Sequence, residues 1–289
     1  MALKAGDEVV LWEQNHQCNN MAWDVRAARH GFSIKRVTVP STVKSADEIV
    51  KLFEAALTPR TKVLSITHIS NTSGMRLPAK ELCSMARQRG IYAHLDGAQT
   101  WGYLKLNLKE IGCDSYGASA HKWLMGPKQV GVLYVRQERI AELWPSIVSA
   151  GWNEDAFTTK TAFKKFETLG QRDDGGVSAI GTAVDFHRMI GLEKIEARTT
   201  ALATALKEGL AKMNKVQLVT PMDPQFSGGV VISKMPDLDR GKMSALVKDL
   251  YEKYGIAGAA TGGLRLSPHV YNTMSDIELA LRGVRELLG

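Results

Sequence analysis

The sequence predicts an α/β fold, in which a mostly parallel sheet flanked by helices is followed by a smaller C-terminal α+β domain. Through residue 135, short apolar runs of strand length alternate with helical segments, and this order favours a parallel sheet covered by helices. Proline and glycine then interrupt residues 137–177, which contain no long periodic segment. Beyond them, two long helical segments precede a second group of strand-like runs. A chain of 289 residues is long enough for one or two domains.

The elements of the first domain have local signals for where they begin and end. Ser45 is a favoured N-cap for a helix over residues 45–57. Gly90 is a common stop for a helix over residues 79–89. A further helix opens within residues 14–23 and runs to about residue 30. Strands are expected at residues 9–12, 32–39, 63–67, 92–96, 115–118 and 130–135.

The C-terminal half has the spacing of a helical domain with a small sheet. Leu202, Leu206 and Leu210 form an i, i+4, i+8 stripe, which we interpret as core packing. Helices are expected at residues 178–187, 192–213 and 276–288, and strands at 217–220, 228–233 and 263–267. We therefore predict a large domain over residues 1–150, a connecting segment over 151–176 and a small domain over 177–289.

Polar side chains follow two of the predicted strands at the point where each strand ends. Asp96 ends the apolar run over residues 92–96, and the run over 115–118 leads directly to Ser119, His121 and Lys122. In an open α/β sheet, ligands bind in the crevice at the carboxyl ends of the strands. We therefore expect a carboxylate, a hydroxyl, an imidazole and an amine to meet at one edge of the sheet.

The chemistry of a desolvated lysine explains the use of such a group. Lys122 is followed by Trp123, Leu124 and Met125, and an amine among apolar neighbours loses its proton near neutral pH and attacks a carbonyl. The natural carbonyl partner is pyridoxal phosphate (PLP), whose ring nitrogen needs an acidic residue such as Asp96. The alternative is a solvated lysine and an ordinary helix-capping aspartate, which explains either residue alone better than it explains both together.

These segments resemble the active-site signature of the class V PLP enzymes, a fold type I family that includes cysteine desulfurases, kynureninases, isopenicillin N epimerase-like proteins and some transaminases. The run SAHKW at residues 119–123 is similar to the family's Schiff-base lysine segment. The resemblance therefore implies that Lys122 is the Schiff-base lysine and that Ser119 and His121 contact the cofactor phosphate. The similar motifs stand in the family's order and spacing along the whole chain.

The same resemblance implies roles for residues around the cofactor ring. In the run DGAQ at residues 96–99, Asp96 matches the partner of the pyridine nitrogen and Gln99 a partner of the phenolic oxygen. Asn71, in the run HISN at residues 68–71, matches a second partner of the phenolic oxygen. His16 matches a histidine that stacks on the ring, although a surface or capping histidine is the alternative.

Two further segments match the family's substrate and subunit contacts. Arg265 matches the arginine that binds a substrate α-carboxylate, for which the planar guanidinium is suited; a salt bridge to a local acid is the alternative. Residues 166–173 resemble a segment that reaches the neighbouring subunit's phosphate, with Gln171 where relatives usually have threonine. Gln171 still donates a hydrogen bond, while Arg172 and Asp173 could instead pair with each other. The resemblance thus implies a homodimer with the site at its interface.

The start of the sequence differs from that of its relatives. They have a preceding segment that includes a helix N-terminus for the cofactor phosphate, so we expect a chain that is shortened at its N-terminus. This raises an alternative function, a catalytically weak or vestigial family member that acts as a binding subunit. The presence of Lys122, Asp96, Gln99 and His121 opposes that alternative.

The position of the cysteines bears on the reaction. Cysteine desulfurases need a mobile cysteine in the loop before the arginine strand, and residues 254–263 contain none. Cys18, Cys83 and Cys113 lie elsewhere in the motif order. We therefore expect an aminotransferase, epimerase or lyase that acts on an amino acid, and not a cysteine desulfurase. The sequence does not decide among these three reactions.

Composition excludes several other classes of protein. The net charge is +7, but basic and acidic residues are interspersed, which favours a solvated surface over a nucleic-acid partner. No apolar run is long enough to cross a membrane and no secretion signal is visible, so we expect a cytoplasmic protein. The three cysteines share no metal-ligand spacing, which predicts no metal site. No Gly-x-Gly-x-x-Gly turn follows an early strand, which argues against a dehydrogenase.

Overall fold

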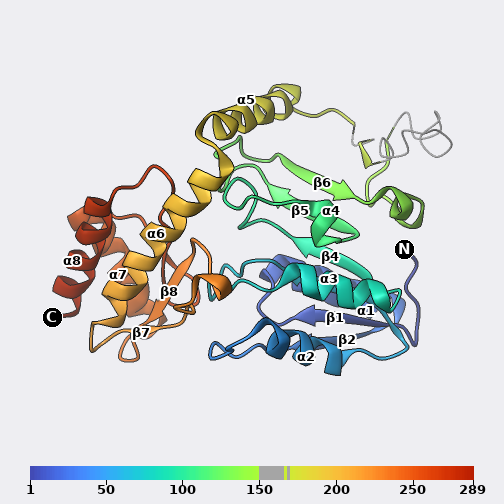
Figure 1. The fold of residues 1–289 in the computed structure, drawn as a ribbon, viewed down its shortest axis with the longest axis horizontal. Helices are drawn as coiled ribbons and strands as arrows, with labels where there is room; N and C mark the ends of the chain where they lie inside the picture. The colour runs from blue at the N-terminus through green and yellow to red at the C-terminus, as the bar shows by residue number, and fades with distance from the viewer. Residues whose placement is uncertain (150–165, 168–169) are drawn as a thin grey trace.

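The computed structural model describes residues 1–149, 166–167 and 170–289, and its larger sheet lies within the first 135 of them (Figure 1). This six-stranded sheet has the order β2-β1-β3-β4-β5-β6. The first five strands are parallel, and β6 pairs antiparallel with β5. The mostly parallel sheet predicted from the sequence is thus confirmed. The strands are β1 Glu8–Trp12, β2 Ser33–Val37, β3 Thr61–Thr67, β4 Tyr92–Asp96, β5 Ser115–Ser119 and β6 Gly131–Val135.

Helices cover both faces of this sheet, and strand alternation shows why. In β1, Val10 and Trp12 belong to a core shared with α2 (Ala46–Ala56) and α3 (Ala79–Gln88). Val9 and Leu11 point to the other face, where they pack with α1 (Gln17–His30). Because both faces are covered, the strand is apolar at successive positions. Ser45 caps α2 as predicted, since its hydroxyl accepts a hydrogen bond of 3.2 Å from the Glu48 N–H.

The smaller sheet lies in the C-terminal part of the chain and is antiparallel, with the order β7-β8-β10-β9. Its strands are β7 Gln217–Leu218, β8 Val231–Lys234, β9 Ala259–Ala260 and β10 Leu264–Leu266. The predicted stripe of Leu202, Leu206 and Leu210 on α6 (Leu192–Ala211) is fully buried in the core of this part. Helices α7 (Arg240–Tyr254) and α8 (Met274–Leu288) complete it (Figure 1).

Two elements begin three or more residues away from the position expected from the sequence, for physical reasons. The strand expected from residue 228 starts at Val231, because Gly228 and Gly229 pack against the large sheet's loops. A Cβ on Gly229 would lie 2.4 Å from the Trp123 ring. The helix expected from residue 178 starts earlier, as α5 (Asp174–Ile190), because the Asp173 side chain accepts from the Gly176 N–H at 3.0 Å and caps it.

Among the described residues, four helices and the short strand β9 were not expected from the sequence. Helix α7 is the largest of these helices, and its buried face is formed by Met243, Leu246 and Leu250. The other helices are α4 (Leu108–Ile111) and the 3-10 helices η1 (Gln137–Glu142) and η3 (Pro224–Phe226). None of the described helices is long and apolar enough to cross a membrane.

A buried carboxylate fixes the start of β1 to its neighbours. Glu8, 2% exposed, accepts hydrogen bonds from Thr58 at 2.6 Å and from Arg60 Nε at 2.9 Å. Lys35 Nζ lies 3.0 Å from the same carboxylate. The Thr58 hydrogen bond, with the two cations, lowers the pKa of Glu8 to about 2 although burial opposes the shift.

We expect Glu8→Gln to destabilise the protein by about 1–3 kcal/mol at pH 7, because charge-assisted hydrogen bonds are lost. The folded pKa of about 2 lies below the ordinary value of 4.5. The carboxylate therefore stabilises the fold fully above pH 4.5, and this contribution is lost as the pH falls toward 2. In thermal melts, the Tm difference between the two proteins should shrink over this range. A difference that stays constant would contradict the assignment, and Glu252→Gln, an exposed change, is the control.

Candidate functional site

The carboxyl edge of the large sheet collects the predicted strand-end residues. Thr67 of β3 is in register with Asp96 of β4, and Asp96 with Gly117 of β5. Asp96 accepts hydrogen bonds from the Thr67 hydroxyl at 3.0 Å and from the Ala98 N–H at 2.9 Å. The carboxylate is therefore held at the strand end in one orientation. Thr67 had no role assigned from the sequence.

The connection from β5 to β6 is a closed turn that presents Lys122. Its ends are joined by the hydrogen bond from the Ala120 N–H to the Val130 carbonyl, at 3.0 Å. Within it, the Met125 N–H donates to the Lys122 carbonyl at 2.9 Å. Met125 has φ of 56°, a left-handed conformation that costs energy for a side chain of this kind. Neighbouring contacts must therefore hold the turn.

A cavity of about 400 Å³ at this edge brings together His16, Asn71, Gln99, Lys122 and Arg265. It is of the size that accommodates a small ligand or cofactor. The large sheet's loops provide the first four residues, and β10 of the small sheet provides Arg265. The remaining lining residues are Trp123, Ser267, His269 and Tyr271.

Burial makes the Lys122 amine easier to deprotonate. Lys122 is half-buried, and this desolvation lowers its pKa below the ordinary 10.5. The Asp96 carboxylate acts in the opposite direction, and the Arg265 guanidinium lowers the pKa further. Of the predicted neighbours, Trp123 and Leu124 are buried. Met125 is 38% exposed, so its expected part in shielding the amine was wrong, because the turn directs it outward.

Gln99 and Asn71 keep hydrogen-bonding capacity for a ligand. The Gln99 side-chain oxygen accepts a hydrogen bond from the Trp123 indole N–H at 2.8 Å. This bond fixes the orientation of the amide, and the amide nitrogen remains a donor for a ligand. Asn71 is 9% exposed, and its buried Oδ1 has no hydrogen-bond partner within the described structure. A buried amide without a partner is costly and is a common feature of a site that binds a polar group.

His16 lies at the start of α1, where its Nδ1 accepts from the Cys18 N–H at 3.2 Å. It is therefore a helix cap as well as a cavity residue. The adjacent Asn15 fixes this loop to β3, since it accepts from the Thr67 N–H at 2.7 Å and donates to the Ser65 carbonyl at 2.9 Å.

Arg265 is half-buried in the middle of β10. Burial lowers the pKa of its guanidinium, because charge is costly away from water. Among the ion pairs of the described residues, none involves Arg265. The alternative of a local salt bridge therefore has no support there, and the guanidinium is available to an anionic ligand.

Four predicted site residues lie outside the cavity lining. Asp96 does not line the cavity, but its carboxylate influences the pKa of Lys122. Ser119 is half-buried at the end of β5, and His121 is exposed. Gln171 is exposed and follows residues 168–169, which are outside the described part. Arg172 pairs with Asp174 at 3.2 Å, not with Asp173, which caps α5. The proposed phosphate contacts stay predictions.

Sequence reasoning missed the aromatic residues that hold the Lys122 turn. Trp123 is buried between Tyr103 and His269, with ring centroids 5.1 and 5.3 Å away. His269, left without a role from the sequence, is buried and lines the cavity. Their contacts join segments far apart in the chain, so no local pattern could have predicted them.

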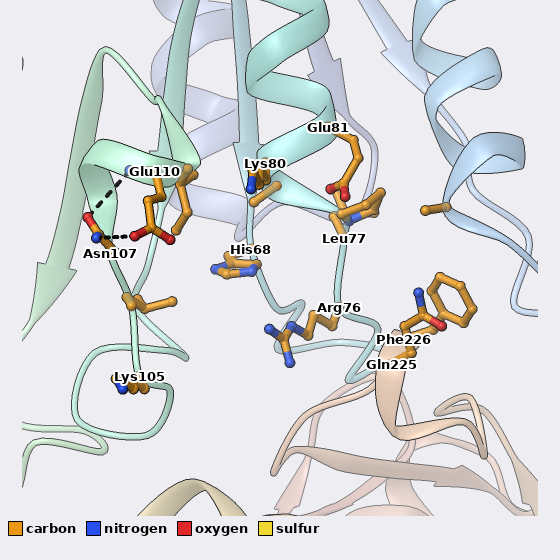
Figure 2. Close-up of a pocket in the computed structure, with 15 residues that line it drawn as sticks. His68, Arg76, Leu77, Lys80, Glu81, Lys105, Asn107, Glu110, Gln225 and Phe226 are labelled. Carbon is orange, nitrogen blue, oxygen red and sulfur yellow. Dashed lines mark hydrogen bonds between the residues drawn. The ribbon is translucent and has the colours of Figure 1, made fainter. Parts of the chain in front are cut away.

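A second cavity, of about 360 Å³, lies near the start of α3 and contains none of the predicted site residues (Figure 2). His68, Arg76, Lys80, Glu81 and Glu110 project toward it. Its cations and carboxylates are mixed, and burial lowers the pKa of His68 to about 3, which keeps this ring neutral. This second cavity therefore contains neither the Lys122 amine nor the Arg265 guanidinium.

Comparisons with known proteins identify similar enzymes with two different activities. Isopenicillin N epimerase of Streptomyces clavuligerus is 32% identical over 305 residues, which span 100% of this chain and 76% of that protein. A cysteine desulfurase of Salmonella dublin is 28% identical over 312 residues, 99% of this chain and 73% of that protein. Because both activities occur among the relatives, the comparisons do not support the expected exclusion of a cysteine desulfurase.

Solved structures confirm the fold type I prediction. The Escherichia coli cysteine desulfurase CsdA has a TM-score of 0.85 at 24% identity, over 99% of this chain and 73% of its own. A C-DES variant with glycine covalently linked to its PLP cofactor has a TM-score of 0.84 at 23% identity, over 97% and 74%. Residues 1–280 match the aminotransferase class V family. The chain therefore belongs to the class V aminotransferase family.

Proposed function

We propose that this protein is a PLP-dependent enzyme that acts on an amino acid. The observation that supports it most is the cavity in which a desolvated Lys122 amine and a half-buried Arg265 guanidinium occur together. A primary amine with a lowered pKa is the group that reacts with an aldehyde. A guanidinium without an acidic partner is the group that binds a carboxylate. An amino acid requires both functions close together.

The residues present fit PLP. Asn71 has a buried amide oxygen without a partner in the described structure, and Gln99 has a free donor nitrogen in the same cavity. Asp96 provides the carboxylate that a pyridine nitrogen needs, and Thr67 and the Ala98 N–H hold it in place. When bound, PLP accepts electrons from the substrate's Cα. Lys122 would hold it covalently, and His16 would cover its ring.

The chain's own groups then have separate tasks. Arg265 binds the substrate α-carboxylate through two parallel hydrogen bonds. Lys122, whose pKa is lowered by burial, would accept the proton from Cα as general base. Asp96, held by Thr67 and the Ala98 N–H, would keep a proton on the ring nitrogen of the cofactor through its negative charge. The atom to which the proton returns distinguishes epimerisation from transamination, and the same residues serve either reaction.

The cysteines support a reaction other than desulfuration, although desulfurases are among the relatives. Residues 254–263, which lead into β10, contain no cysteine. Cys83 and Cys113 are buried, and burial raises the pKa of both thiols, that of Cys113 to about 11. Cys18 is exposed near His16. We therefore propose an epimerase, aminotransferase or lyase; the homodimer and cytoplasmic location implied by the family resemblance stay predictions.

Lys122→Ala should abolish covalent retention of PLP, because the amine that forms the bond is absent. The measurement is the absorption spectrum after incubation with PLP and desalting. Lys128→Ala, in the same turn, is the matched control and should retain PLP as the wild type does. Equal retention by the Lys122 variant would refute the assignment of this lysine.

Arg265→Gln should weaken the binding of amino acids about 100-fold, since two charge-assisted hydrogen bonds are lost. Spectral titration of the PLP-loaded protein with L-alanine and with ethylamine separates the carboxylate from the amine. We expect a large change for alanine and little change for ethylamine, which lacks the carboxylate. Parallel losses for both ligands would show that Arg265 does not bind the carboxylate.

Any release of sulfide from L-cysteine by the PLP-loaded wild type should be unchanged in Cys18→Ser, because no cysteine lies in the loop before β10 to accept the sulfur. The assay measures sulfide production in the presence of dithiothreitol, which reduces any persulfide formed on a protein cysteine. Catalytic release that disappears in Cys18→Ser would instead make the protein a desulfurase with a differently placed thiol.

A further inference from the structure

The carbonyl group of Trp123, next to Lys122, faces two histidine rings. His187 Nε2, from α5, lies 3.0 Å from this oxygen, and His269 Nε2, which follows β10, lies 3.1 Å from it. Both rings are buried, with 2% and 7% exposure. A carbonyl oxygen has two lone pairs and only accepts, so it can bind two N–H donors. Two separate elements thus place an imidazole nitrogen against the backbone of the lysine turn.

The surroundings of each ring show which histidine can serve as a constant donor. His269 Nδ1 is buried and has no partner in the described structure, and burial lowers the pKa of this ring. Its single proton therefore belongs on Nε2, where it is donated to Trp123. His187 faces carbonyl oxygens at both nitrogens, since its Nδ1 lies 2.9 Å from the Ala183 oxygen. A neutral His187 donates to only one of them.

His269 also holds the Trp123 side chain. The two rings stack with centroids 5.3 Å apart and an interplanar angle of 15°, and Tyr271 stacks on the outer face of His269 at 4.6 Å. The Trp123 indole N–H in turn donates to Gln99 at 2.8 Å. One imidazole therefore contacts both the backbone and the side chain of the residue next to Lys122, and reaches Gln99 through it.

The packing around this turn leaves little space for it to move. A Cβ on Gly229 would lie 2.4 Å from the Trp123 ring, and one on Gly102 would lie 2.5 Å from the Leu124 backbone. Met125 keeps its left-handed φ of 56° in the same turn. Such a conformation persists only where surrounding contacts hold it. The His269 hydrogen bond is one of these contacts.

His269 also connects the turn to the arginine strand. It lies four positions after Arg265 in the sequence. The backbone N–H of His269 donates a hydrogen bond to the Asn272 side-chain oxygen at 2.9 Å, which fixes the loop after β10. The strand that would bind the substrate carboxylate and the turn that presents the amine are thereby joined by one side chain.

We propose that His269 is a positioning residue for Lys122, acting through its Nε2–H hydrogen bond to the Trp123 carbonyl, with His187 as a second donor. The proposal deepens the proposed function and rests on it only for the role of the amine in catalysis. The hydrogen bond keeps the Lys122 amine in its half-buried place between Asp96 and Arg265. Without it, the turn relaxes and the amine moves toward water.

The test uses the reactivity of Lys122 before PLP is added, so it does not depend on the cofactor. Trace acetylation by acetic anhydride over a pH series, followed by peptide mass spectrometry, measures the pH midpoint for each lysine. Lys248, 70% exposed on α7, is the internal control. His269→Phe keeps a stacking ring and removes the donor. His269→Gln places an amide N–H near the position of Nε2, while His269→Asn is too short to do so.

We expect His269→Phe and His269→Asn to raise the Lys122 midpoint by roughly one pH unit, toward its solvated value. His269→Gln should restore the wild-type midpoint, and Lys248 should not change in any variant. The matched glutamine and asparagine variants decide the question if the phenylalanine variant does not fold. Unchanged midpoints in all folded variants, or equal shifts in the glutamine and asparagine variants, would overturn the proposal.

A second measurement separates this proposal from the proposed function. In PLP-loaded protein, the pH midpoint of the cofactor's absorbance change should shift in His269→Asn and not in His269→Gln. A wild type that retains no PLP on Lys122 would refute the proposed function, while the acetylation result would still decide the positioning role of His269.

Discussion

The desolvation of one amine is the constraint on which the rest of the site depends. Water stabilises a charged lysine, so Lys122 keeps a lowered pKa only while the turn between β5 and β6 holds it away from water. That turn contains a residue in a left-handed conformation and is not stable by its own local preferences. The turn is stabilised instead by contacts with buried rings and glycines and by histidine nitrogens at the Trp123 carbonyl.

The arrangement also explains why two sheets are needed. The parallel sheet places Asp96 and the lysine turn at one edge, because parallel strands end at the same side. The antiparallel sheet contributes Arg265 from β10. A carboxylate site and an amine site on separate sheets can be placed at the spacing of an amino acid and held there by contacts between the sheets. Gly229 against Trp123 and His269 against the Trp123 carbonyl are two of those contacts.

The strands of the large sheet and the polar residues at their ends could be predicted from the sequence. In a parallel sheet, a polar residue that follows an apolar strand lies at the carboxyl edge. The supporting contacts could not be predicted, since His187 and His269 lie 64 and 146 positions from Trp123. Helix α7 is different, because the sequence does contain a local signal for it. This signal consists of the cap, the buried face and the stop of the helix, which are Asp239, Met243, Leu246, Leu250 and Gly255. The reaction is hard to predict because similar proteins have different activities.

Identification of the lysine that binds PLP tests the central claim most directly. The wild-type protein is incubated with PLP, reduced with borohydride and digested, and the modified peptides are identified by mass spectrometry. The account predicts one modified residue, Lys122, at a stoichiometry near one per chain. Modification spread over exposed lysines such as Lys248, with Lys122 unmodified, would contradict it, because the buried amine would then not be the reactive one.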